Sequence, residues 1–181
     1  PQNKEELQVA VDMWVCDTGH HDEEQADECD PELALETYGH ISEWDVSLIT
    51  DMSYLFQSHW SEESSFNDDI SNWDVSNVTD MAGMFIDADA FNQDISNWDV
   101  SNVTNMAVMF NRCFSFNQDL SSWDVSSVTN MWSMFKASNM NGDLSEWDVS
   151  SVTDMAALFY STNFNQDISS WDVSSVINMN A

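Results

Sequence analysis

Apolar residues recur along this chain at nearly constant positions within units of 24 to 29 residues. Each unit holds the tetrapeptide Trp-Asp-Val-Ser, and six tryptophans mark the units: Trp44, Trp73, Trp98, Trp123, Trp147 and Trp171. A fixed period in the twenties is the sequence signature of a solenoid, in which stacked coils share one core. The pattern therefore predicts a repeat array and places function on a repeated surface.

The clearest unit covers residues 91–110, Phe-Asn-Gln-Asp-Ile-Ser-Asn-Trp-Asp-Val-Ser-Asn-Val-Thr-Asn-Met-Ala-Val-Met-Phe. Residues 94–96 alternate polar, apolar and polar, which is typical of a strand with one buried side chain. Thr104 suits the N-cap of a helix, and Met106, Met109 and Phe110 would share one helical face. Each coil is therefore predicted to contain a short parallel β-strand and a short helix.

Residues 1–40 lack the repeat and are predicted to form an N-terminal helical cap. Residues 3–6 have the spacing of a capping box, followed by apolar residues at helical intervals, so we expect a helix over about 4–15. Asp30 as N-cap, Pro31 at the first position and Gly39 as the stop predict a second helix. An acidic loop lies between them. The tandem repeats then occupy 41–181, and the whole chain is expected to be one domain.

The repeated sequence motif is long enough to compare with known families. Residues 91–106 and the run 110–116, Phe-Asn-Arg-Cys-Phe-Ser-Phe, resemble BspA-like leucine-rich-repeat surface proteins, most closely the short tandem repeats of mycoplasma lipoproteins also found in marine microalgae. The resemblance covers about 41–179, and residues 6–14 resemble the cap of algal members. It implies a leucine-rich-repeat-like solenoid of about six coils, 24–25 residues each, in a secreted or cell-surface protein that binds or adheres. It supplies no catalytic residues and no cofactor.

Charge narrows the range of partners. Three Lys and Arg stand against 33 Asp and Glu, for a net charge of −30, which argues against nucleic acid because phosphate binding needs clustered cations. We expect a protein or glycan ligand, and basic protein surfaces are among the expected partners. The longest apolar run is far shorter than the roughly 20 residues that span a bilayer, so no transmembrane segment is predicted. An extracellular or cell-surface location follows from the resemblance.

Aspartates recur at fixed positions and should form ladders of like charge in the stack. At the roughly 4.8 Å spacing of paired chains, two carboxylates repel by about 1 kcal/mol in water and several times more at lower dielectric. Turn capping, in which each aspartate accepts the N–H two residues on, would offset this repulsion. Rows of calcium ions are the alternative, which the presence of only four glycines disfavours.

Aromatic residues that break the repeat are the candidate binding residues. Trp60 lies beside His59 in an unusually long connection, and Tyr54 is out of pattern. Trp132 occupies a position that holds small residues in the other units: Ser53, Ala82, Ala107 and Ala156. Such a ring either fills a local gap or faces a partner. The regular tryptophans, methionines and phenylalanines are predicted to form the core instead.

Cysteines and asparagines suggest covalent features of a secreted protein. A Cys16–Cys29 disulfide is preferred over a zinc site that would also use His20 and His21, because adjacent histidines rarely converge on one ion. Cys113 is expected to be a buried free thiol. Asn77 and Asn102 begin N-x-Thr sequons and are glycosylation candidates.

The four histidines all precede the regular array and the serines are periodic, so no catalytic site is expected and the chain is predicted not to be an enzyme. It is instead predicted to be a protein-binding or adhesion module. The alternative is a structural subunit within a larger multiprotein assembly. Because solenoid ends need covering, the C-terminal edge is expected to contact further repeats, a second copy or a partner subunit.

Overall fold

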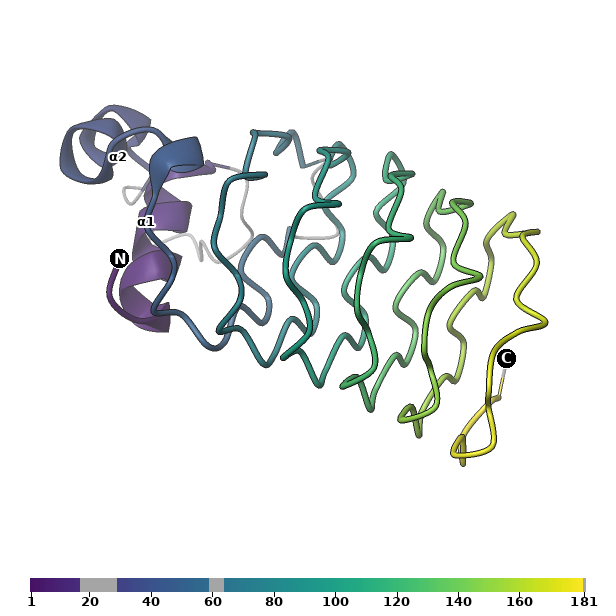
Figure 1. Ribbon diagram of the computed structural model, residues 1–181. Coiled ribbons are helices and arrows are strands. Elements are labelled where there is room, and N and C mark those ends of the chain that lie inside the picture. The colour runs from purple at the N-terminus through teal and green to yellow at the C-terminus, as the bar shows by residue number, and fades with distance from the viewer. Residues whose placement is uncertain (17–28, 59–63, 181) are drawn as a thin grey trace.

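The computed structural model describes residues 1–16, 29–58 and 64–180 of the chain. Figure 1 shows a helical unit at the N-terminal end, followed by coils stacked side by side, with the C-terminus at the opposite end of an elongated molecule. The described residues contain three helical elements: α1 (Lys4–Trp14), α2 (Pro31–Tyr38) and the 3-10 helix η1 (Ile41–Glu43). We name each coil below by the tryptophan of its Trp-Asp-Val-Ser tetrapeptide.

Both helices of the predicted cap are confirmed. The Asn3 side chain accepts a hydrogen bond from the Glu6 N–H, and the buried side of α1 contributes Leu7 and Val11 to the core. In α2 the Asp30 side chain accepts from the Leu33 N–H, Pro31 is the first residue and Gly39 ends the helix with a φ of 78°. These helices form where predicted because their start and stop signals are local in sequence.

The predicted strand and helix in each coil are wrong. Among residues 44–58 and 64–180 no strand and no helix forms, and neighbouring coils meet in isolated parallel bridges. The bridges follow one position through the stack: Asp51, Asp80, Asn105, Asn130, Asp154 and Asn178. A leucine-rich-repeat fold with a strand and a helix per coil is therefore not what this chain adopts. It is a stack of coils built from turns.

Backbone hydrogen bonding explains why the helix does not form. The Met109 N–H donates within its own coil to Met106 O (3.2 Å), but the next N–H, of Phe110, donates to Met134 O in the following coil (2.9 Å). Val108, the residue before Met109, has a φ of 53°, in the left-handed region. An α-helix needs every N–H to bond four residues back at negative φ, so this alternation excludes it. Thr104 is accordingly not an N-cap, and its hydroxyl donates to Thr79 O (3.1 Å).

The predicted strand is replaced by a turn. The Asp94 carboxylate accepts the Ser96 N–H at 3.0 Å, which bends the chain at the residues expected to be extended. Ile95 between them is nevertheless fully buried, as the alternation predicted. The side-chain pattern thus identified the inward residue correctly although the backbone around it is not a strand.

Aromatic columns fill the centre of the stack, which confirms the core interpretation of the repeated rings. Phe85 and Phe110 of successive coils stack with centroids 5.5 Å apart, and Phe110 packs on Phe116, the first residue of the next unit, at 4.0 Å. Trp98 is 4% exposed and its indole N–H donates to Ile70 O of the preceding coil at 3.2 Å. One hydrophobic cluster runs from Leu7 in α1 to Leu158, so the cap and the coils share a core.

Candidate functional site

The aspartate ladder is satisfied within each coil, which confirms turn capping. Asp99 Oδ1 accepts both the N–H (3.1 Å) and the hydroxyl (2.6 Å) of Ser101. The backbone bond to the serine two residues on is repeated at the equivalent aspartates: Asp45, Asp74, Asp124, Asp148 and Asp172. A second ladder makes it at Asp69, Asp94, Asp119, Asp143 and Asp167.

These hydrogen bonds outweigh the repulsion between neighbouring carboxylates. The hydroxyl and the N–H of Ser96 lower the pKa of Asp94, although desolvation and the nearby charge of Asp119 act in the opposite direction. The same serine contacts lower the pKa of Asp99. At Asp94 the serine hydrogen bonds therefore outweigh the repulsion from Asp119. Among the described residues, no three His, Cys, Asp or Glu side chains converge as a metal-binding group.

Trp132 is the most conspicuous departure from the repeat at the surface. Its side chain is 47% exposed, whereas Ala107 and Ala156 at the same position of the adjacent coils are 7% and 6% exposed. The ring therefore projects from a flat stretch of surface and does not fill a gap in the core. This exposure argues against gap filling, and contact of the ring with a partner stays a prediction.

Tyr54 lies three coils closer to the cap than Trp132, and main-chain hydrogen bonds between successive coils link the two positions. A ladder of bonds connects them: Tyr54 N–H to Ala82 O (2.9 Å), Gly83 N–H to Ala107 O (2.8 Å) and Val108 N–H to Trp132 O (2.8 Å). We call these six residues the Tyr54–Trp132 strip. Tyr54 is 45% exposed, and its ring lies against Gly83, where a Cβ would be only 2.5 Å from Tyr54 Cδ1. Glycine at 83 therefore makes room for the tyrosine. His59 and Trp60, the other two candidates, lie outside the described residues.

Two further exposed aromatics were missed by the sequence analysis. Phe114 is 48% exposed with the Arg112 guanidinium 5.5 Å from its ring centre, and Tyr160 is 51% exposed with the Lys136 ammonium at 5.6 Å. Arg112 is also paired with Asp87. The comparison of equivalent positions that identified Trp132 would have found both rings. Asp89 and Asn139 occupy the position of Phe114 in adjacent coils, and Asn111 and Lys136 occupy that of Tyr160.

The cysteines divide into one pair and one free thiol. Cys16 and Cys29 form a disulfide with their Cα atoms 5.1 Å apart, which leaves neither thiolate for the zinc alternative. His20 and His21 lie outside the described residues. Cys113 is free and buried as expected, its Sγ donates to Ala88 O at 3.1 Å, and burial raises the pKa of the thiol. Cys113 is therefore structural and unreactive.

Comparison with protein-family models gives two overlapping matches, over residues 32–142 and 136–181, to the family described as Mycoplasma protein of unknown function, DUF285. The chain belongs to this family. The match confirms the mycoplasma-type repeat resemblance, while the BspA-like assignment stays a prediction. No match was found among the curated proteins or the solved structures.

The two sequon asparagines of this DUF285 chain are exposed but engaged. Asn77 Nδ2 donates to Ser47 O and Asn102 Nδ2 donates to Ser76 O, both at 2.8 Å, so each amide ties its coil to the preceding one. An amide nitrogen has two hydrogens and these bonds use one of them. Glycosylation of either residue stays a prediction, with both side chains at the surface.

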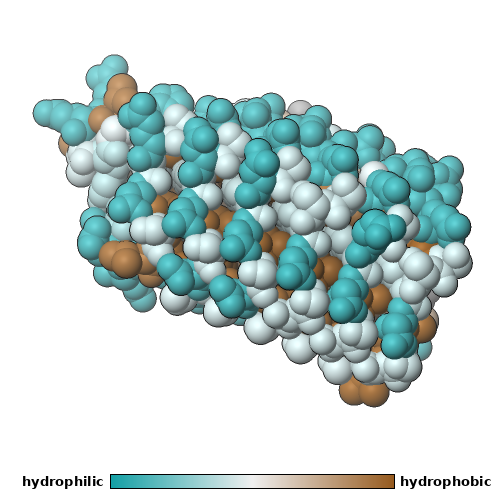
Figure 2. Space-filling model, viewed as in Figure 1, coloured by the Kyte–Doolittle hydropathy of each residue, from teal (hydrophilic) through white to brown (hydrophobic). Residues whose placement is uncertain are grey.

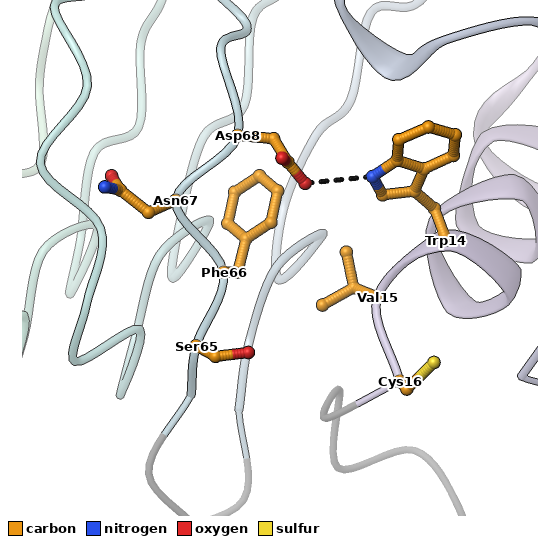
Figure 3. A pocket seen from close by; sticks show the side chains of 7 residues that line it. All are labelled: Trp14, Val15, Cys16, Ser65, Phe66, Asn67 and Asp68. Atoms are coloured by element: carbon orange, nitrogen blue, oxygen red, sulfur yellow. Dashed lines mark hydrogen bonds between the residues drawn. The ribbon is translucent and has the colours of Figure 1, made fainter. Parts of the chain in front are cut away.

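Figure 2 shows how the DUF285 coils present themselves to solvent: hydrophilic side chains form parallel rows along the stack, with hydrophobic surface mainly in narrow seams between them. A hollow of about 390 Å³ lies between the C-terminal end of α1 and residues 65–68, and Figure 3 shows Trp14, Phe66 and Asp68 around it. The Trp14 indole donates to Asp68 Oδ2 at 2.9 Å. This bond joins the cap to the coils, and we assign the hollow no ligand.

Proposed function

We propose that this chain is a non-enzymatic protein-binding or adhesion module of a secreted or cell-surface protein, with the Tyr54–Trp132 strip as its binding face. The observation that supports it is the exposure of Trp132, 47% against 6–7% for the alanines beside it. Exposed tryptophan and tyrosine are enriched among residues that dominate binding energy, because they bury much area with few rotatable bonds. Trp132 is therefore the proposed anchor.

The strip has the shape that such an anchor needs. Ala82, Ala107 and Val108 are each 6–7% exposed, so the surface between the two rings is low and apolar. Because the strip is held by main-chain bonds from coil to coil, it is a rigid platform. Three coil spacings of about 4.8 Å separate Tyr54 from Trp132, so one partner surface of ordinary size can cover both rings.

The net charge supports a basic partner surface, and the disulfide supports an extracellular location. A net charge of −30 favours a basic partner surface, since electrostatic complementarity speeds association and excludes acidic competitors. The Cys16–Cys29 disulfide suits an oxidising, extracellular environment. Within the described part of the chain, no helix has the length and apolar character needed to cross a bilayer.

The test is affinity capture from a secreted and surface-protein fraction, followed by a measured Kd for each captured protein. Trp132→Ala installs the residue that neighbouring coils carry, and should weaken binding of a genuine partner by at least about 30-fold, the effect of a hot-spot residue. Phe114→Asn, which also installs a neighbouring coil's residue at a similarly exposed ring, is the matched control and should change the Kd by less than about threefold. Unchanged affinity of Trp132→Ala, or capture of glycans only, would contradict the proposal.

A structural subunit of a larger assembly stays the alternative to this proposal. An obligate subunit would associate or precipitate when isolated. A monodisperse acidic monomer in size-exclusion chromatography with light scattering would favour the binding module.

A further inference from the structure

Acidic residues are absent from two stretches in the middle of the stack. Residues 100–118 and 125–142 contain no Asp or Glu, although the whole chain has 33 of them. The same stretches hold Arg112 and Lys136, two of the three Lys and Arg residues of the chain. They therefore carry two positive side chains and no negative one, in a molecule whose net charge is −30.

Lys136 is the cation that has no carboxylate partner. Each of the other two, Lys4 and Arg112, pairs with an aspartate, whereas no ion pair to the Lys136 ammonium forms within residues 1–16, 29–58 and 64–180. Its Nζ lies 5.6 Å from the ring centre of Tyr160 in the following coil. A cation beside an aromatic ring is attracted by the ring but keeps its N–H donors for another acceptor. The ammonium can therefore receive a carboxylate from outside the chain.

Arg112 and Phe114 form a second pair of the same kind next to Lys136. The Arg112 N–H donates to Lys136 O at 2.8 Å, so the two cations come from backbone positions in direct contact. The guanidinium carbon lies 5.5 Å from the Phe114 ring centre, and Nε donates to Asp87. The two Nη atoms donate to nothing in the described part of the chain, and they form an edge that can bind a carboxylate through two parallel bonds. We call Arg112, Phe114 and Lys136 the Arg112–Lys136 cluster.

The coils stack without these side chains elsewhere in the array. Asn111 occupies the position of Lys136 in the preceding coil, and Asp89 and Asn139 are the equivalents of Phe114 in adjacent coils. Phe114 is 48% exposed although described coils lie on both sides of it. Two cations and an exposed ring thus gather where neighbouring coils carry other residue types, as expected of a binding surface and not of a packing element.

We propose that the Arg112–Lys136 cluster binds a saccharide that carries one carboxylate, such as a terminal acidic sugar of a glycan. The carboxylate accepts hydrogen bonds from the Arg112 Nη atoms and from the Lys136 ammonium. An apolar C–H face of the sugar packs on the exposed Phe114 ring, whose π-face is electron-rich. Aromatic surface combined with a few directed polar groups is the usual composition of small-ligand sites. The cluster shares no residue with the Tyr54–Trp132 strip, so this is a second binding activity.

Charge selects a singly charged saccharide over an acidic protein or a polyanion. The net charge of −30 repels any partner that places many negative charges across a broad surface. A single carboxylate interacts mainly with charges within about 8 Å at physiological ionic strength. At the cluster these include Arg112 and Lys136, and the carboxylate in contact with Arg112, that of Asp87, is already paired with it. A ligand with a small footprint therefore retains the local attraction.

NMR titration of the intact chain tests the proposal with three probes. Sialyllactose carries one carboxylate, lactose is its neutral counterpart, and a blocked tripeptide with a central aspartate represents an acidic peptide. Sialyllactose should shift the backbone amide signals of Arg112 and Lys136 with a Kd of roughly 1 mM, as a few contacts on an open surface provide. Lactose and the peptide should bind at least about tenfold more weakly, because each lacks one of the two recognised features.

Matched variants separate the cluster from the net charge. Lys136→Gln and Lys4→Gln each remove one positive charge, but only Lys136→Gln should weaken sialyllactose binding, by at least about fivefold. Phe114→Asn, which installs the residue of a neighbouring coil, should weaken it at least about threefold. Equal weakening by the two glutamine variants, equal affinity for lactose, or no binding overturns the proposal, and equal affinity for the peptide would identify an acidic peptide as the ligand instead. None of these outcomes depends on the protein partner proposed for the strip.

Discussion

Truncation of one repeat tryptophan tests whether the stacked rings are the main source of stability. Trp98 is 4% exposed, lies 6.3 Å from the ring of Phe85 and donates its indole N–H to Ile70 O. Trp98→Ala should cost about 3–5 kcal/mol, because the cavity opens in a core shared by adjacent coils. The lost hydrogen bond adds only about 1 kcal/mol or less, since Ile70 O keeps the Trp73 N–H as a donor.

Trp132→Ala is the matched control for that experiment. The same side chain is deleted, but it is 47% exposed, and alanine already occupies its position in two neighbouring coils. We expect a loss below about 1 kcal/mol, the usual range for surface substitutions. Urea unfolding followed by circular dichroism gives the free energy of each variant. Equal losses at the two sites would refute the assignment of Trp98 to the core and Trp132 to the surface.

Three further predictions concern the backbone and the aspartates. Ala157 has a φ of 55° at the position of Gly83, so Ala157→Gly should raise the free energy of unfolding by about 0.5–1 kcal/mol, while Ala156→Gly at the adjacent residue should lower it. Calorimetry of both variants checks the opposite signs. Because serines cap the aspartates, a calcium chelator should leave the Tm nearly unchanged, and a drop of many degrees would indicate bound ions. Serine hydrogen bonds lower the pKa of eight capped aspartates below the ordinary 3.8, so the folded state binds protons less readily than the unfolded state: Asp45, Asp69, Asp94, Asp99, Asp119, Asp148, Asp167 and Asp172. Stability should therefore be lost as pH falls below about 4, and a Tm that rises on this acidification would contradict the capping argument.

The features that could be predicted from the sequence are those fixed by interactions between residues close in sequence. Asn3 and Asp30 start their helices through bonds to residues three positions on, so both helices were found. The inward residues of each coil were also found, because burial follows the repeat whatever the backbone does. Turn capping by Asp99 was found for the same local reason.

The backbone of the coils could not be found in this way. Met106, Met109 and Phe110 fit a helical face, but the donors between them alternate between their own coil and the next, which no local signal encodes. Val108 in the left-handed region is contrary to the preference of a β-branched residue. Gly83 at the equivalent position was the one sequence signal, and it becomes meaningful only when the columns are compared. Hydrogen bonding between coils therefore overrides the local preference for a helix.

This pairing also explains where a DUF285 chain can acquire specificity. Main-chain bonds hold one coil to the next, and capped aspartates and buried rings use up the inward and turn positions. Outward positions such as that of Trp132 contribute little to the stack, so a large ring there is tolerated without altering the backbone. A binding surface can thus arise by substitution at a few outward positions, as at Tyr54 and Trp132. For this reason we place the proposed function on departures from the repeat and not on the repeat itself.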